Sequence, residues 1–333
     1  MERIGDPIDF RLLDEWQREF PLVERPFAEI GLRIGCAEVD VVSRLAALRA
    51  SGRISRVGAT CAPNTVSAST LAALSASTEN LETVAEIVGR QPGVNHSYLR
   101  ENHWNLWFVT TGPDRAHVDR TLDTIRAETG LQVLDLPLVR PFNVDLGFKL
   151  TDDTTKAPVP RPIRLDLLRD GDRAILQSLT TGMPLCARPF ALIAKELDRT
   201  EEEVLARIDV LQQAGIISRL GVIVRHRALG WSSNAMVVWD VAAENVTAAG
   251  TSLAAHPGVT LCYERRPVEG VWPFRLYCMI HAKSRGQALD TLTGASMLPE
   301  LADVPYRVLF SSRCFKQTGA LIAEKIAEKG EAA

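Results

Sequence analysis

The sequence predicts an α+β fold in which one composite unit occurs twice in tandem. Each copy is expected to be a winged helix-turn-helix followed by a ferredoxin-like βαββαβ sandwich. Three observations predict this: short motifs of the first half recur in order in the second, a proline-rich segment separates the halves, and both halves change from helical to strand periodicity. The 333 residues are enough for two such copies.

The repeated motifs are the strongest of these observations. The tripeptide RPF at 25–27 recurs at 188–190, and GRISRVG at 52–58 recurs as GIISRLG at 215–221. The order persists further along the chain, where PGV occurs at 92–94 and 257–259 and NLWF at 105–108 corresponds to RLYC at 275–278. Since the spacing changes only by short insertions, the chain is a tandem duplication.

The segment between the copies, 151–164, alternates prolines with other residues after a polar run, which is typical of an extended linker. The boundaries follow from it. We expect helix-turn-helix units at 1–65 and 165–230 and sandwiches at 66–150 and 231–318. The stretch 319–333, rich in Ala, Glu and Lys, is expected to be a tail that is either a short helix or frayed.

The helix-turn-helix is clearest in the second copy. Apolar residues at helical spacing predict helices over 172–179 and 189–197. Thr200 followed by three glutamates is typical of a capping box and begins a third helix. The β-rich run 216–224 then predicts the wing strand.

Alternating strand and helix patterns predict the sandwich that follows. In the second copy we expect strands at 234–241, 259–266, 274–282 and 304–311, with helices at 244–255 and 285–293. In the first copy we expect strands at 71–76, 94–100, 104–111 and 133–139, with helices at 81–89 and 115–129.

Composition and charge limit the classes of function. Lys and Arg number 38 against 41 Asp and Glu, so the net charge is −3 and the chain lacks the surplus of cations typical of a nucleic-acid-binding protein. Both third helices also begin with carboxylates, Glu38 and Asp40 in the first copy and 201–203 in the second, where a DNA reader would face phosphates. DNA binding is therefore not expected.

Compartment and metal content can also be inferred from the sequence. No run of about 18 apolar residues predicts a membrane span, and the N-terminus lacks the apolar segment of a signal peptide. The six cysteines include no C-x-x-C pair, so neither a disulfide framework nor a structural zinc site is expected. We expect a cytoplasmic protein without membrane contact.

Side chains suited to chemistry gather on the central hairpin of the first sandwich. Strand alternation places His96, Tyr98 and Arg100 on one face, and His103 and Trp104 follow directly at the return of the hairpin. A sandwich core would not ordinarily contain His, Tyr and Arg together on one face.

The second hairpin has a different set of residues. It keeps the tyrosine and arginine as Tyr263 and Arg265, adds Arg266, Trp272 and Arg275, and has no histidine. In one interpretation the two copies have different roles: the first carries out proton transfer, and the second provides a cationic, aromatic cradle for a ligand. Such a surface suits a flat polyanion, because arginines bind carboxylates and aromatic rings cover an apolar macrocycle. The other interpretation is structural: the arginines pair with acidic neighbours and the tryptophans anchor an interface.

The order of helix-turn-helix and sandwich resembles the AsnC/Lrp family. The hairpin residues resemble a narrower family, the siroheme decarboxylases of heme d1 biosynthesis. The resemblance is carried by the run from His96 to Phe108, by 143–148 at the end of the first copy, and by 272–277 in the second. It implies a D-type and an L-type unit fused in one chain. It also implies conversion of siroheme to 12,18-didecarboxysiroheme, two acetate side chains becoming methyl groups, with no added cofactor.

The resemblance also implies roles for individual residues. His96 and His103 would be catalytic, as proton donors or, for one of them, as the ligand of the substrate iron, and Arg100 would act with them by binding a carboxylate. No protein-bound metal is expected. The remaining substrate-binding residues would be Tyr98, Trp104, Tyr263, Arg265, Arg266, Trp272 and Arg275.

The other histidines and the assembly complete the expectations. His226, between two arginines after the wing, is expected to line a groove between the helical part and the sandwich, whereas His117, His256 and His281 are expected at the surface or in packing. The two halves should pair with each other, and the fused chain should form a homodimer. The alternative function is an AsnC/Lrp-type transcription regulator that senses a heme-like or small metabolite.

Overall fold

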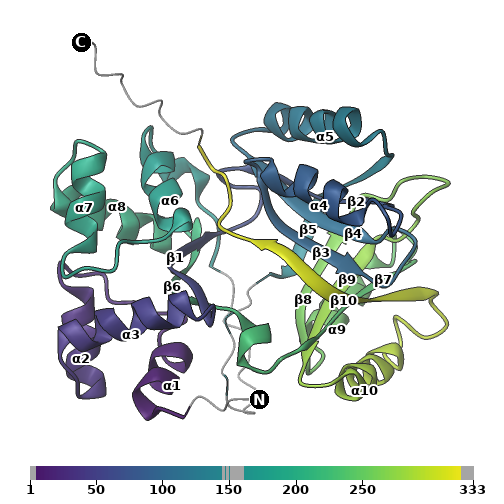
Figure 1. Ribbon diagram of the computed structural model, residues 1–333. Helices are drawn as coiled ribbons and strands as arrows, with labels where there is room; N and C mark the ends of the chain where they lie inside the picture. Colours follow the sequence, from purple (N-terminus) through teal and green to yellow (C-terminus); the bar gives the residue numbers. More distant parts are fainter. Residues whose placement is uncertain (1–4, 145–146, 148–149, 151–160, 324–333) are drawn as a thin grey trace.

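The computed structural model describes residues 5–144, 147, 150 and 161–323 (Figure 1). Residues 151–160 of the predicted linker, 324–333 of the predicted tail and three residues of the 143–148 segment (145, 146 and 148) lie outside this description. A helical part and a barrel part lie side by side in Figure 1, and the chain passes through both twice.

The helical part contains both predicted helix-turn-helix units. The first consists of α1 (Pro7–Asp14), α2 (Pro26–Ile34), α3 (Glu38–Ala50) and wing strand β1 (Ile54–Cys61). The second consists of a 3₁₀ turn (Leu165–Leu167), α6 (Asp172–Thr181), α7 (Pro189–Glu196), α8 (Glu201–Gln213) and β6 (Ile217–Val224). Thr200 and Glu203 form the predicted capping box at the start of α8. Apolar residues of both units form one continuous core.

The two wing strands join the units. β1 and β6 pair antiparallel with Gly58 opposite Gly221, both from the repeated motif. A Cβ on Gly58 would lie 2.2 Å from the carbonyl oxygen of Leu179 in α6, and one on Gly221 would lie 2.4 Å from that of Trp16, just after α1. Each glycine therefore lets the first helix segment of the other copy approach its strand closely.

The barrel part contains eight strands in the closed order β10-β3-β4-β2-β5-β8-β9-β7. The first copy supplies β2 (Ala68–Leu74), β3 (Val94–Arg100), β4 (Leu106–Gly112) and β5 (Val133–Asn143), with helices α4 (Leu81–Arg90) and α5 (Arg115–Thr129). The second supplies β7 (Ser233–Trp239), β8 (Val259–Arg265), β9 (Leu276–Ala282) and β10 (Tyr306–Gln317), with α9 (Val246–Ala255), α10 (Arg285–Ser296) and a 3₁₀ turn, η2 (His226–Leu229).

Two strands are longer than predicted, and their extra length closes the barrel. β5 was expected over 133–139 and β10 over 304–311, but both continue into the other copy. β5 pairs first with β2 and then with β8, and β10 pairs first with β7 and then with β3. The halves therefore pair with each other, as predicted, but as one shared barrel and not as two separate sheets.

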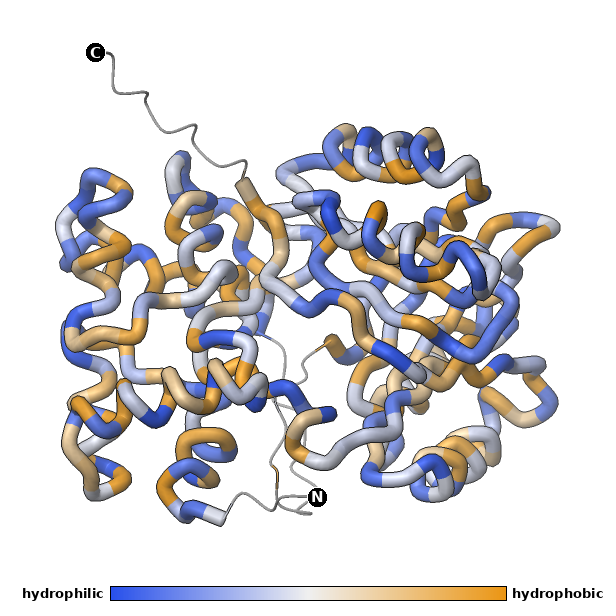
Figure 2. Tube along the Cα trace, in the orientation of Figure 1, coloured by the Kyte–Doolittle hydropathy of each residue, from blue (hydrophilic) through white to orange (hydrophobic). Residues whose placement is uncertain are grey.

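Strand alternation gives the barrel wall two apolar faces. The interior face is filled by residues from both copies, among them Trp107, Tyr263 and Tyr277. The outer face packs under α4 and α5 in one copy and under α9 and α10 in the other. Along α5, Figure 2 shows hydrophilic and hydrophobic residues alternating, as expected for a helix with one buried and one exposed face.

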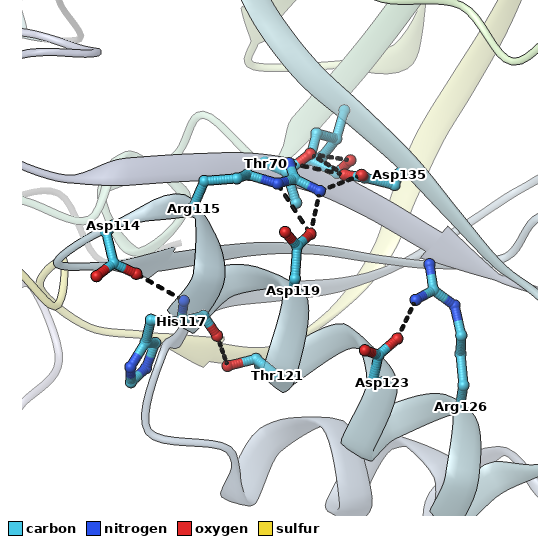
Figure 3. Close-up of polar contacts among 10 residues, drawn as sticks. Thr70, Asp114, Arg115, His117, Asp119, Thr121, Asp123, Arg126 and Asp135 are labelled. Atoms are coloured by element: carbon cyan, nitrogen blue, oxygen red, sulfur yellow. Dashed lines mark hydrogen bonds and ion pairs between the residues drawn. The ribbon is translucent and has the colours of Figure 1, made fainter.

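A charged cluster fixes α5 on this outer face (Figure 3). Arg115, in the first turn of α5, bonds Asp119 one turn later and Asp135 on β5. Thr70 on β2 donates to the same Asp135 at 2.6 Å. The cluster therefore ties the helix to two neighbouring strands.

The segment after β10 differs from the expected helix or frayed tail. Its described part, 318–323, is not helical and connects the barrel to the helical part. The Leu321 amide donates to Thr111 Oγ1 at 2.8 Å, the Ile322 amide donates to Gln177 Oε1 of α6 at 2.6 Å, and the Ile322 side chain is fully buried. These long-range contacts explain why local composition misled the prediction.

Candidate active site

A cavity of about 270 Å³ lies where the β1–β6 ribbon meets one end of the barrel. Both copies and both parts of the chain line it. Its basic side chains are Arg56, Arg219, Arg225, Arg227, His96, His226 and His281. Among the described residues of its wall there is no Asp or Glu. The cavity is therefore suited to an anion.

Two of the arginines come from the repeated motif. Arg56 on β1 and Arg219 on β6 occupy equivalent positions, and the antiparallel ribbon brings both to the cavity. The Arg56 Nη2 donates to the Ala59 carbonyl at 3.2 Å, while its Nε is buried without a hydrogen-bond partner in the described structure. Burial, and secondarily the charge of Arg219, lower the Arg56 pKa to about 10, so the guanidinium remains protonated at pH 7.

His96 and Tyr98 enter the cavity from β3, and their rings lie nearly parallel with centroids 6.4 Å apart. Burial, with a smaller effect of Arg56, lowers the His96 pKa to about 4. The imidazole is therefore neutral at pH 7, a form that can ligate iron. A substrate carboxylate nearby would raise this pKa, so that a larger fraction of the rings would carry a proton to donate at pH 7.

Two further histidines come from the second copy. His226 on η2 and His281 on β9 have ring centroids 6.1 Å apart, and Trp231 meets His226 edge-on. The prediction that His226 lines a groove between the helical part and the sandwich is confirmed. The prediction for His281 is wrong, because this side chain also lines the cavity.

Arg100 lies behind the cavity wall and not on it. Its guanidinium lies over the Tyr98 ring at 5.6 Å and donates to the Leu309 carbonyl at 3.0 Å and to Asn234 Oδ1 at 3.3 Å. The side chain is only 6% exposed. Its surroundings are those of an internal support.

His103 and Trp104 lie away from the cavity. His103 is exposed at the hairpin between β3 and β4, and its ring meets Trp104 edge-on. Trp104 packs against the apolar interior of the barrel. The predicted grouping of His103 with His96 does not occur, because the hairpin tip and the cavity are at different places along the strand.

The predicted second-copy cradle does not line this cavity either. Tyr263 and Trp272 belong to the barrel core, and Arg265 is buried, lying 4.6 Å over Tyr263 and donating to the Leu136 carbonyl at 2.8 Å. Arg266 is exposed and Arg275 half-buried. The reason is the closed barrel, in which this face of the strand turns inward and meets the opposite wall.

The most important residues missed from the sequence are Arg56 and Arg219. Their signal was present, since each copy repeats the sequence Ile-Ser-Arg followed by an apolar residue and a glycine. His281 was missed for another reason. Its partners, Asn234 and Thr260, lie on two other strands, so no local pattern identifies it.

The acidic starts of α3 and α8 form internal ion pairs. Glu38 bonds Arg25, and Glu201 bonds Arg188, the arginine in each case belonging to the repeated RPF motif. These carboxylates therefore connect the two helices of each helix-turn-helix. That the protein does not bind DNA remains a prediction.

Within residues 5–144 and 161–323, no helix has the length and apolar character needed to cross a membrane. The same part of the chain holds no group of three or more side chains suited to a metal ion.

Family models match both parts of each copy. A model described as the siroheme decarboxylase NirDL-like helix-turn-helix domain matches 9–54 and 172–217. A model described as an AsnC-like ligand-binding domain matches 66–143 and 228–316. The matches follow the duplication and agree with the division into helical and barrel parts.

Similar proteins cover nearly the whole chain. A siroheme decarboxylase NirDL subunit of Paracoccus denitrificans is 54% identical over 96% of this chain and 98% of its own. A crystal structure of the siroheme decarboxylase NirDL matches with a TM-score of 0.65 and 26% identity, covering 94% of this chain and 93% of that one. A second, in co-complex with an iron-uroporphyrin III analogue, has the same TM-score and 25% identity over 95% and 94% of the two chains.

Proposed function

The chain belongs to the siroheme decarboxylase family, and from this premise we propose that it converts siroheme to 12,18-didecarboxysiroheme in heme d1 biosynthesis. The observation that carries the proposal is the cavity between ribbon and barrel. Four arginines and three histidines line it, with no carboxylate among its described residues. Siroheme carries many carboxylates, and charge-assisted bonds from arginine are strong, at about 1.5–3 kcal/mol each.

The reaction balances with one proton for each carboxylate lost. In each step the bond between the acetate methylene and its carboxylate breaks, carbon dioxide leaves, and the electron pair passes into the conjugated macrocycle. A proton then reaches the methylene carbon, which becomes a methyl group. The protein must therefore hold the spectator carboxylates, desolvate the reacting one and deliver a proton.

We assign these tasks to residues that line the cavity. Arg56 and Arg219 hold carboxylates from the ribbon side, since they are equivalent positions of the two copies and face one cavity. His96 acts from the barrel side, either as the ligand of the substrate iron or as the proton donor. Tyr98 stays protonated, because burial raises its pKa, and is a hydrogen-bond donor beside His96.

The macrocycle itself can accept the electron pair, so the proposed reaction is that of a carboxy-lyase without an added cofactor. We further propose that the enzyme works in the cytoplasm and as a homodimer of the fused chain. The homodimer is supported by exposed apolar side chains on α2 and α3, where Leu32 is 80% and Val39 70% exposed. Sedimentation equilibrium of the purified chain tests it.

The experiment that tests the function is an anaerobic incubation of the purified chain with siroheme, followed by the mass of the tetrapyrrole. We expect the loss of two carbon dioxide units. Tight binding of siroheme without any change of mass would overturn the proposal and favour a ligand-sensing regulator, whose promoter binding should weaken steeply with salt.

A further inference from the structure

A chain of hydrogen bonds runs from the barrel interior to the cavity wall. Arg100 Nη1 donates to Asn234 Oδ1 at 3.3 Å, and the Asn234 amide nitrogen lies 2.8 Å from His281 Nε2. On the other side of the ring, His281 Nδ1 lies 2.7 Å from Thr260 Oγ1, which donates to the Met279 carbonyl at 3.0 Å. Both ring nitrogens of His281 therefore have protein partners.

The direction of every bond in this chain is determined by chemistry. A guanidinium can only donate, so Asn234 must turn its carbonyl oxygen to Arg100 and its NH₂ group to the ring. His281 Nε2 is then an acceptor, and the ring proton sits on Nδ1. The Thr260 hydroxyl oxygen accepts a hydrogen bond from the protonated Nδ1, and the same hydroxyl donates a hydrogen bond to the Met279 carbonyl. Only one tautomer fits.

The two copies differ at the pair of positions that holds the His281 ring and the Asn234 amide. Asn234 and His281 lie directly opposite each other on β7 and β9. The equivalent positions on β2 and β4 of the first copy are Ser69 and Thr111, which also lie opposite each other. The ring and the amide that orients it therefore occur together only in the second copy.

We propose that Arg100, Asn234 and Thr260 are positioning residues that hold His281 as a neutral ring with its proton on Nδ1, and that His281 in turn supports the ring of His226 in the cavity. His281 faces Arg100 from β3, Asn234 from β7, Thr260 from β8 and His226 from η2. With both nitrogens engaged, it neither donates the catalytic proton nor ligates iron. Its role in decarboxylation rests on the proposed function, whereas the tautomer does not.

The tautomer can be measured directly in the full chain. Nitrogen NMR of protein labelled at histidine distinguishes a protonated from an unprotonated ring nitrogen, and the variant His281→Gln assigns the signals. We expect Nδ1 to be protonated and Nε2 unprotonated at pH 7. A wild-type ring with its proton on Nε2 would overturn the proposal.

Two near-isosteric variants test the partners. Asn234→Asp offers only acceptors, so we expect His281 to gain a proton on Nε2. Thr260→Val removes the acceptor of the Nδ1 proton, and Thr260→Ser restores it. Unchanged His281 signals in both Asn234→Asp and Thr260→Val would contradict the network, and circular dichroism confirms that each variant folds.

Decarboxylation assays separate this proposal from the function. We expect kcat for siroheme to fall by up to about 100-fold in Asn234→Asp and Thr260→Val with KM near the wild-type value, and to recover in Thr260→Ser. A wild-type chain with the expected tautomer but no decarboxylation would overturn the proposed function alone. Full kcat in Asn234→Asp, with the tautomer changed, would overturn the positioning role alone.

Discussion

The β3–β4 hairpin of the first copy and the β8–β9 hairpin of the second share a tyrosine–arginine pair and differ in their histidines. Arg100 lies over Tyr98 in one, and Arg265 over Tyr263 in the other. Both arginines are buried and donate to backbone carbonyls. The two arginines support the barrel interior, but Tyr98 lines the cavity whereas Tyr263 lies in the barrel core. Residue types common to both hairpins are therefore not by themselves the signature of a site.

The histidines of the cavity are distributed unequally. His96 corresponds to Leu261 in the second copy, and His281 corresponds to Thr111 in the first. The cavity arginines Arg56 and Arg219, by contrast, are equivalent. We infer a division of labour in which the equivalent arginines bind a polyanion from two sides, while His96, unique to the first copy, acts as proton donor or iron ligand and His281, unique to the second, is a positioning residue.

The change with the largest expected effect makes the first copy resemble the second. His96→Leu removes the imidazole and keeps an apolar side chain of similar volume. If His96 donates the proton, kcat should fall by about 10²–10⁴-fold, the range for general acid catalysis. Anaerobic siroheme turnover measures kcat, and the absorption spectrum of bound siroheme shows whether an iron ligand has been lost. Full turnover with an unchanged spectrum would show that His96 neither donates the proton nor ligates the iron.

Weakening the equivalent arginines is expected to have a smaller effect. Arg56→Gln and Arg219→Gln should each weaken siroheme binding by about 10- to 100-fold, as expected for loss of a charge-assisted bond. Absorbance titration measures the dissociation constant. Arg120→Gln, on the exposed surface of α5, is the matched control and should bind as the wild type does. Equal effects of all three variants would show a non-specific charge effect.

The buried histidines should also make stability depend on pH. The folded-state pKa of both His96 and His281 is about 4, below the value of 6.5 expected in the unfolded chain. The unfolded state therefore binds more protons between these pH values, so the free energy of unfolding is highest above pH 6.5 and falls as the pH decreases toward 4. Each histidine should contribute roughly 3 kcal/mol to this fall.

Urea unfolding between pH 4 and pH 7 measures this dependence. The slope should be smaller in His96→Leu and in His281→Gln than in the wild type. His103→Ala, at an exposed position, should leave the slope as it is. A wild-type slope in both cavity variants would contradict the assigned pKa values.

The smallest expected effect is that of a substitution at His103, the residue for which the structure and the sequence-based prediction disagree. His103 was predicted to be catalytic, but it is exposed at the hairpin tip. His103→Ala should therefore change siroheme turnover by no more than about twofold, since surface substitutions are usually near neutral. A loss of kcat comparable to that of His96→Leu would show that the hairpin tip reaches the substrate.

Local patterns predicted most of the fold. The helix-turn-helix and the order of strands and helices follow from apolar periodicity within each copy. The closed barrel could not be predicted in the same way, because the ends of β5 and β10 are ordered by pairing with the other copy. The non-helical course of 318–323 depends likewise on contacts with Gln177 and Thr111.

The candidate site was predicted in part. His96 and Tyr98 could be identified because they cluster in the sequence, and His226 because it lies between two arginines after the wing. Arg56 and Arg219 lie in the repeated motif, whose sequence by itself indicates only the duplication. Placing them in the cavity requires the β1–β6 ribbon, which joins residues far apart in the chain.

We propose that siroheme binds in one cavity built by both copies. The most direct test is a crystal structure of this chain with iron-uroporphyrin III, a carboxylate-rich iron tetrapyrrole. We expect the macrocycle to lie between the β1–β6 ribbon and the barrel, with its carboxylates on Arg56 and Arg219 and its face toward His96. A macrocycle bound at the β3–β4 hairpin tip beside His103, or on the outer face of the barrel, would contradict it.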